Sequence, residues 1–147
     1  MRLGQTLAQS LVPGIRLYLK GELGSGKTTL VRATLRALGV TGPIKSPTYA
    51  LVELYVVSRL HLYHFDFYRF RDPLEWRDAG FDEYFADSGV CLVEWPERAA
   101  DQLPAPDIEI LLGFSGAGRD AQITANSEAG TKCLEIVSDL KSREGSS

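Results

Sequence analysis

The sequence has few of the features that mark secreted, disulfide-stabilised or membrane proteins. Its 147 residues include two cysteines, Cys91 and Cys133, which are too few for a disulfide framework and fit a reducing compartment. No apolar run approaches the roughly 18 residues that a membrane-spanning helix needs. Gln5 and Gln9 interrupt the apolar residues near the N-terminus, and no small-residue cleavage site follows, so no signal peptide is predicted. We therefore expect a soluble, cytoplasmic protein without a membrane-bound part.

The overall composition is that of an ordinary globular domain. Hydrophobic residues make up 44% of the chain and charged residues 24%, which excludes a mainly disordered or collagen-like protein. A chain of this length has room for one compact domain with a real core. We expect this domain to span residues 1–140, followed by a disordered polar tail over residues 141–147.

The two halves of the sequence differ in charge, although the net charge is only −3. Residues 1–75 carry 10 Lys and Arg against 5 Asp and Glu, whereas residues 76–147 carry 6 against 14. A basic half could attract ligands that bear phosphate. Halves of a sequence need not be faces of a fold, so both interpretations stay open at this point.

Hydrophobic periodicity and turn residues predict alternating helices and strands. Leucines recurring every four positions predict a short helix over Leu3–Leu11, which stops at Pro13-Gly14. The order of the elements predicts an α/β fold, a P-loop NTPase-like sheet of mixed parallel and antiparallel strands flanked by helices. The other predicted elements are, in chain order, a strand at Ile15–Leu19, a glycine-rich turn at Gly21–Gly26, a helix at Thr28–Leu38 ended by Gly39, strands at Tyr49–Val57 and Leu60–Phe67 that pair across Ser58-Arg59, a short helical or irregular region at Pro73–Asp87, a buried strand at Gly89–Trp95, strands at Ile108–Leu112 and Ala121–Ala125 around a turn at Gly113–Gly118, and a helix at Thr131–Leu140.

One segment satisfies the phosphate-loop pattern G-x-x-x-x-G-K-[ST] at every fixed position, between a predicted strand and a predicted helix. The segment is Gly21-Glu22-Leu23-Gly24-Ser25-Gly26-Lys27-Thr28. Its glycines let the backbone bend around an anion and present N–H groups to it, and the helix that follows adds its positive end. Lys27 would contact the β- and γ-phosphates, and the Thr28 hydroxyl would bind Mg²⁺. We therefore predict nucleotide binding, with Lys27 as a catalytic residue.

Two carboxylates follow predicted strands, where a phosphate-loop enzyme needs acidic groups. Asp66 lies at the end of the strand Leu60–Phe67, and Glu94 ends the apolar run Val90–Val93. Ligands of open α/β sheets bind beyond the carboxyl ends of the strands, and a buried carboxylate favours a nearby cation. We predict that both residues serve catalysis. The alternative is that they are strand-terminal carboxylates exposed to water.

A third candidate is the turn Ser46-Pro47-Thr48-Tyr49, between the first long helix and the next strand. Thr48 could approach the γ-phosphate or its metal, as in the nucleotide-sensing loops of other phosphate-loop enzymes. By composition alone the segment is an ordinary turn.

Four motifs in this order give the sequence a specific resemblance. The phosphate loop is followed by Ser46–Tyr49, by His64-Phe65-Asp66-Phe67-Tyr68-Arg69 and by Glu94-Trp95-Pro96-Glu97. In this the chain resembles the TsaE (YjeE) family, the bacterial ATPase of tRNA threonylcarbamoyladenosine biosynthesis. The resemblance covers about residues 1–125, including Gly118-Arg119 before the last predicted strand.

The resemblance implies a role for several residues. Thr28 and Glu94 would ligate Mg²⁺, Asp66 would be needed for hydrolysis, and Trp95 would lie near the nucleotide. His64, Tyr68 and Arg69 match the second motif without a separate role being implied, and a histidine in a strand is more often packed or hydrogen-bonded than a ligand. The ATP phosphates would be held by Glu22, Leu23, Gly24, Ser25, Gly26, Lys27, Thr28 and Thr29.

The resemblance also implies cofactors and partners. ATP and Mg²⁺ would be bound, and the partners would be TsaB- and TsaD-type proteins of the threonylcarbamoyladenosine-forming complex, with tRNA reached through that complex. Members of the family usually carry a longer segment before the first strand than residues 1–14 of this chain. That segment helps them to hold the nucleotide base.

Three other functions compete with an ATPase. A small-molecule kinase normally has an arginine-bearing lid, and no comparable basic segment follows the phosphate loop here. A small GTPase would carry Asn-Lys-x-Asp and Asp-x-x-Gly motifs, which this sequence lacks. A non-catalytic module that presents an ATP-dependent interaction surface stays open, since it needs the same loop.

Overall fold

A single twisted sheet organises the structure, a computed structural model that describes residues 2–22, 24–45, 47, 50–58, 60–115 and 118–145. In this part of the chain the sheet has six strands in the order β2-β3-β4-β1-β5-β6. Its four central strands run parallel, and each edge strand is antiparallel to its neighbour, which confirms the predicted mixed α/β sheet. The elements are α1 (Arg2–Ser10), β1 (Arg16–Lys20), α2 (Lys27–Leu38), β2 (Val52–Val57), β3 (Leu60–Asp66), α3 (Pro73–Asp78), α4 (Phe81–Ala86), β4 (Val90–Glu94), η1 (Pro96–Ala99), β5 (Ile108–Ser115), β6 (Gly118–Ala125) and α5 (Glu128–Gly145).

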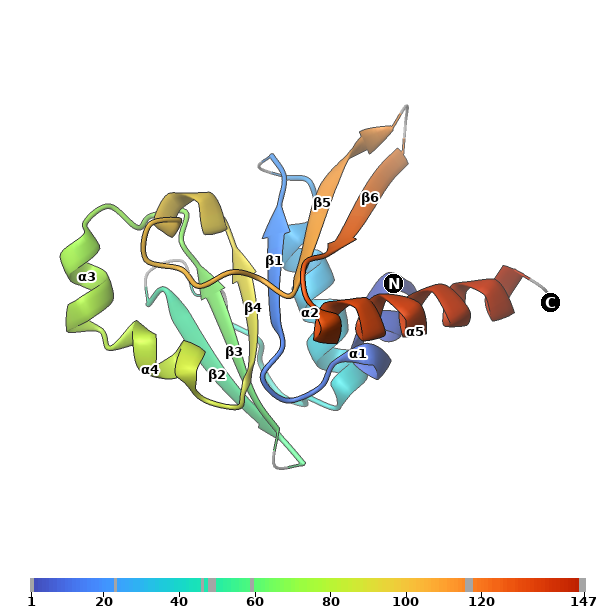
Figure 1. The fold of residues 1–147 in the computed structure, drawn as a ribbon, viewed down its shortest axis with the longest axis horizontal. Coiled ribbons are helices and arrows are strands. Elements are labelled where there is room, and N and C mark those ends of the chain that lie inside the picture. The colour runs from blue at the N-terminus through green and yellow to red at the C-terminus, as the bar shows by residue number, and fades with distance from the viewer. Residues whose placement is uncertain are drawn as a thin grey trace.

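Helices cover both faces of the sheet and make two different cores (Figure 1). Because successive side chains of a strand point to opposite faces, Leu17 and Leu19 of β1 pack toward α1, α2 and α5, whereas Tyr18 packs on the other face. The first core is mainly aliphatic. The second core lies beneath α3 and α4 and is mainly aromatic, with Phe65, Phe67, Trp76, Phe81 and Phe85 in mutual contact.

The same alternation brings polar side chains to the face of the sheet that α2 covers, at the carboxyl ends of the central strands. In β3, His64 and Asp66 alternate with Phe65, which belongs to the aromatic core on the opposite face. Asp66 pairs in register with Glu94 of β4, and Glu94 pairs with Leu19 at the end of β1. The carboxyl ends of three parallel strands therefore meet where α2 begins.

The predicted elements exist, with differences at some of their ends. The strand predicted from Tyr49 begins only at Val52, as β2, because Leu51 before it has φ +68°, outside the strand region. The expected turn at Gly113–Gly118 is wrong in extent, because β5 continues to Ser115 and β6 begins at Gly118, with Gly113 paired to Asp120. Inter-strand hydrogen bonds there override the weak strand preference of glycine and serine. α5 begins at Glu128, earlier than predicted, and continues through residues 141–145, which were expected to be a polar tail. Lys, Arg and Glu are good helix formers, so the composition of this segment favours helix.

Two further predictions concern this part of the chain. Residues 73–87 contain two short helices, α3 and α4, which confirms the predicted helical or irregular region. Arg59, in the predicted β2–β3 turn, lies outside the described residues.

In the described part of the chain, no helix combines the length and apolar character needed to cross a membrane.

Candidate nucleotide-binding site

The loop between β1 and α2 has a backbone path that requires glycine. Gly21 has φ +147°, and a Cβ atom there would lie 2.5 Å from the carbonyl oxygen of Leu112 and 2.7 Å from Oγ of Ser25. Gly26, with φ +103°, is the N-cap of α2 and offers no side chain to the first amides of the helix. Those amides are available to an anion, as in phosphate-binding loops.

The residues predicted to hold phosphates line this loop. Ser25 is buried, Glu22, Gly24 and Thr29 are exposed, and Thr28 is half-buried. Leu23 lies outside the described residues.

Lys27 folds back onto its own loop. Its Nζ donates to the carbonyl oxygens of Gly21 and Glu22, the latter at 2.9 Å, and lies 4.1 Å from the ring centroid of Trp95. The side chain is buried, and burial lowers the pKa of Lys27 against the opposing pull of Glu94, Glu97 and Asp66. Carbonyl oxygens and an aromatic face are both favourable partners for an ammonium group.

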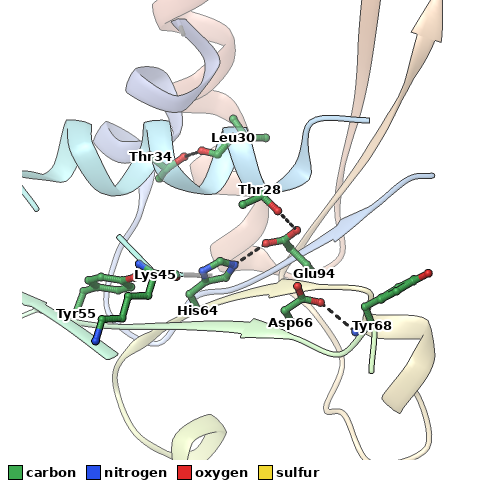
Figure 2. Close-up of polar contacts among 9 residues, drawn as sticks. All are labelled: Thr28, Leu30, Thr34, Lys45, Tyr55, His64, Asp66, Tyr68 and Glu94. Carbon is green, nitrogen blue, oxygen red and sulfur yellow. Dashed lines mark hydrogen bonds and ion pairs between the residues drawn. The ribbon is translucent and has the colours of Figure 1, made fainter. Parts of the chain in front are cut away.

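Glu94 joins the phosphate-loop helix to the sheet (Figure 2). The Thr28 hydroxyl donates to Oε1 of Glu94 at 2.8 Å, and Nε2 of His64 lies 2.6 Å from Oε2. Glu94 and His64 are both 1% exposed. Each oxygen of this carboxylate thus has its own polar partner, one from α2 and one from β3.

Asp66 lies beside this pair, at the end of β3. Its Oδ1 accepts from the backbone N–H of Tyr68 at 3.0 Å, and the side chain is 8% exposed. Burial and then the nearby Glu94 raise the pKa of Asp66, while the Tyr68 N–H, His64 and Lys27 oppose the rise. A carboxylate whose pKa is raised is better suited to accept a proton than one in water.

The segment that follows α2 is hydrogen-bonded to the end of β3. The backbone N–H of Asp66 donates to the carbonyl oxygen of Leu51, and the N–H of Leu51 donates to that of Pro47. Leu51 has φ +68°, in the left-handed region. The predicted Thr48, with Ser46 and Tyr49, lies outside the described residues.

Trp95 follows Glu94 in a conformation that non-glycine residues rarely adopt. Its φ is +57° and it precedes Pro96, whose ring disfavours helical conformations in the residue before it. The indole ring contacts both Lys27 and Tyr68, and the centroids of the Tyr68 and Trp95 rings are 4.9 Å apart. Cζ of Arg98 lies 5.3 Å from the centroid of the Tyr68 ring. The predicted residue Trp95 is therefore in contact with the phosphate-loop lysine.

The oxygens of Thr28 and Glu94 fit a magnesium site of the kind that relies on substrate phosphates. Mg²⁺ prefers hydroxyl and carboxylate oxygens and is usually bound through one or two carboxylates, with phosphates and water completing its shell. Among the described residues, no group of three or more His, Cys, Asp or Glu side chains could hold a metal alone. The chain thus offers a partial shell from α2 and β4.

Two contacts of the site were not predicted. The His64–Glu94 pair depends on the register between β3 and β4, which a single sequence does not give. The i, i+2 spacing of His64 and Asp66 in a strand does place both on one face, and this signal could have linked them. The contact between Tyr68 and Trp95 likewise needs the left-handed backbone at Trp95.

Comparisons with known proteins point to one family. The model described as "Threonylcarbamoyl adenosine biosynthesis protein TsaE" matches residues 1–121. A Haemophilus influenzae protein named "tRNA threonylcarbamoyladenosine biosynthesis protein TsaE" is 37% identical over 144 residues, which cover 95% of this chain and 91% of that protein. The Bacillus subtilis protein of the same name is 43% identical over 104 residues, 71% of this chain and 65% of that protein. The crystal structure of Bacillus subtilis YdiB superposes with a TM-score of 0.81 at 32% identity, covering 95% of this chain and 87% of that one.

Proposed function

This chain belongs to the TsaE family of threonylcarbamoyl adenosine biosynthesis proteins, and we propose that it is a P-loop ATPase that binds and hydrolyses Mg-ATP in support of that biosynthesis. The observation that carries the proposal is the 2.8 Å hydrogen bond between Thr28 and Glu94. In phosphate-loop NTPases the loop Ser or Thr and an acidic residue at a strand end hold the metal together. A glycine-rich turn without this function has no need for such a buried carboxylate.

Each residue of the site has a place in this proposal. The amides at the start of α2 bind phosphate oxygens, and Lys27 contacts the β- and γ-phosphates. Thr28 and Glu94 ligate Mg²⁺, which when bound neutralises phosphate charge. Asp66, with its raised pKa, orients the attacking water and accepts its proton.

We further propose that ATP acts as a switch for a protein complex. The carboxyl ends of the strands, the phosphate loop and two carboxylates all serve ATP, which leaves a chain of 147 residues little room for a second substrate pocket. Hydrolysis therefore serves better to reset a partner than to transfer phosphate to a metabolite. A γ-phosphate can order nearby loops, and its loss can release them. The proposed partners are TsaB- and TsaD-type proteins, with tRNA modified by that complex. The free cysteines Cys91 and Cys133 suit the cytoplasm.

Calorimetry of ATP binding tests the first part of the proposal. Lys27→Ala removes a charge-assisted contact worth about 1.5–3 kcal/mol, so the affinity for Mg-ATP should fall roughly ten- to a hundredfold. Lys132→Ala, whose side chain is 73% exposed on α5, is the matched control and should bind as the parent does. Equal affinity in all three proteins would refute the assignment of Lys27.

Reconstitution of tRNA modification from the partner proteins tests the second part. Sustained multiple turnover should require this chain and ATP, and Lys27→Ala should not support it. Phosphate release measured alongside separates an ATPase from a kinase, which would need an acceptor. Turnover that is indifferent to this chain would leave an ATPase and remove the role in tRNA modification.

A further inference from the structure

His64 is a buried polar residue that makes a polar contact through one of its ring nitrogens. Its side chain is 1% exposed, and Nε2 lies 2.6 Å from Oε2 of Glu94. The other ring nitrogen, Nδ1, is buried and has no hydrogen-bond partner in the described part of the chain. Since buried polar atoms are nearly always paired, an orphan of this kind calls for an explanation.

The chemistry of the partner indicates which ring nitrogen carries a proton. An ionised carboxylate accepts hydrogen bonds and donates none, so Nε2 carries the proton that is shared with Glu94. Nδ1 lacks a partner in the described part of the chain whether or not it carries a proton, so only Nε2 makes a polar contact.

Packing does not explain a histidine at this position. The residues near it on this face of the sheet, such as Leu62 and Leu92, are fully buried and aliphatic. A leucine would fill the position without leaving an unpaired nitrogen, and large apolar residues are the usual occupants of such sites. What a histidine adds is a donor aimed at Glu94.

The register explains what this donor does to the carboxylate. Asp66, not His64, is the residue of β3 that stands opposite Glu94, and His64 stands opposite Leu92. Glu94 thus reaches back along the sheet to His64 with one oxygen, while the other accepts from Thr28 (Figure 2). Two donors on opposite oxygens fix the rotation of the carboxylate as well as its position.

We propose that His64 is a positioning residue for the magnesium site, holding the Glu94 carboxylate so that Oε1 faces Thr28. The inference rests on the proposed Mg-ATP function and assigns to His64 a role beyond packing. Groups that hydrogen-bond to a metal ligand from behind orient it, and losing one typically costs about 10- to 100-fold in metal affinity or activity.

A matched pair of variants tests the proposal. His64→Leu fills the space without a donor, whereas His64→Gln keeps an N–H at about the reach of Nε2. The measurement is ATP binding by calorimetry over a Mg²⁺ titration, with a series in EDTA. We expect His64→Leu to raise the Mg²⁺ concentration for half-maximal binding about tenfold or more, with ATP affinity in EDTA unchanged, and His64→Gln to recover most of the loss.

The outcomes separate this inference from the function on which it rests. If the parent does not bind ATP with Mg²⁺, the proposed function fails. If the parent binds and His64→Leu has the same Mg²⁺ dependence, or His64→Gln is as impaired as His64→Leu, the positioning role is refuted.

A measurement on the unaltered protein covers the case in which His64→Leu does not fold. Long-range ¹⁵N–¹H correlation spectra of the nucleotide-free protein should show a proton on Nε2 of His64, the atom that faces Glu94. A proton on Nδ1 with none on Nε2 would overturn the proposal, since no donor would then face Glu94.

Discussion

At the carboxyl end of β3, Asp66 combines a position suited to catalysis with a cost in stability. Asp66 is nearly buried, and its pKa is raised first by burial and then by the neighbouring Glu94. An acid with a raised folded-state pKa is ionised at a cost that the unfolded chain does not bear. This cost begins as the pH rises above the usual Asp value and is complete above the folded-state pKa. At neutral pH, therefore, the charge on Asp66 opposes folding.

Asp66→Asn should raise the stability of the protein and lower its ATPase activity. Asparagine can still accept the Tyr68 N–H through Oδ1 but carries no charge, so the free energy of unfolding of the nucleotide-free protein should rise at pH 7–8. The gain should shrink as the pH falls toward about 4, the ordinary Asp pKa. Mg-ATP hydrolysis should fall roughly a hundredfold or more, because the proton acceptor is lost. Urea unfolding across pH and a phosphate-release assay measure both.

Asp101→Asn is the control for that experiment, because Asp101 is exposed on a turn after η1. It should change neither quantity. An Asp66→Asn protein that is less stable at pH 7–8 would contradict the claim that the charge on Asp66 opposes folding. One that hydrolyses ATP at the parent rate would contradict its role as proton acceptor.

At the scale of elements, one aspartate ties the last helix to the sheet. Oδ2 of Asp107 accepts from the N–H of Arg16 at 2.8 Å, and Oδ1 accepts from the Ser127 hydroxyl at 2.7 Å. Oγ of Ser127 in turn accepts from the N–H of Gly130 at 3.0 Å, as an N-cap residue does. This chain of hydrogen bonds links the start of β1, the approach to β5 and the first turn of α5.

Ser127→Ala should loosen α5 and leave the nucleotide site intact. The change removes a helix cap and one partner of Asp107, so it should lower the free energy of unfolding by about 1–2 kcal/mol. Ser138→Ala, on the exposed face of the same helix, should be neutral or slightly stabilising because alanine is the better helix former. Chemical denaturation of both variants measures the difference. Equal effects would show that the cap and the Asp107 contact contribute nothing specific.

The elements were easier to predict than the contacts between them. Local signals fixed the helix Thr28–Leu38 with Gly39 behind it, because an apolar period and a left-handed C-terminal glycine are properties of neighbouring residues. The phosphate loop and the two carboxylates followed from pattern and from the rule that parallel strands end at one edge. The extent of β5 and β6, the His64–Glu94 pair and the folded-back Lys27 depend on register and on packing between distant segments, which local signals do not contain.

For the whole molecule, the central strands couple the two cores to the site. β1 places leucines in the aliphatic core and Tyr18 in the aromatic core, and β4 divides Leu92 and Val93 in the same way. Both strands end at the phosphate loop or at Glu94. Losing either core therefore displaces residues of the site. We expect the protein to unfold in one transition, with Trp76 in the aromatic core and Trp95 at the site reporting the same midpoint as the backbone.

A ligand that binds this edge should stabilise the entire molecule. Mg-ATP at about 100 times its Kd should add about 2.7 kcal/mol to the free energy of unfolding, which for a chain of this size raises Tm by roughly 5–10 °C. Thermal unfolding followed by circular dichroism and by tryptophan fluorescence should give the same rise. At the same ligand concentration, Lys27→Ala should lose about half of the rise or more, because that concentration is then only about 1–10 times its weakened Kd. A parent whose Tm ignores Mg-ATP would contradict nucleotide binding. A rise seen by fluorescence alone would mean that the ligand orders the surroundings of Trp95 without stabilising the two cores.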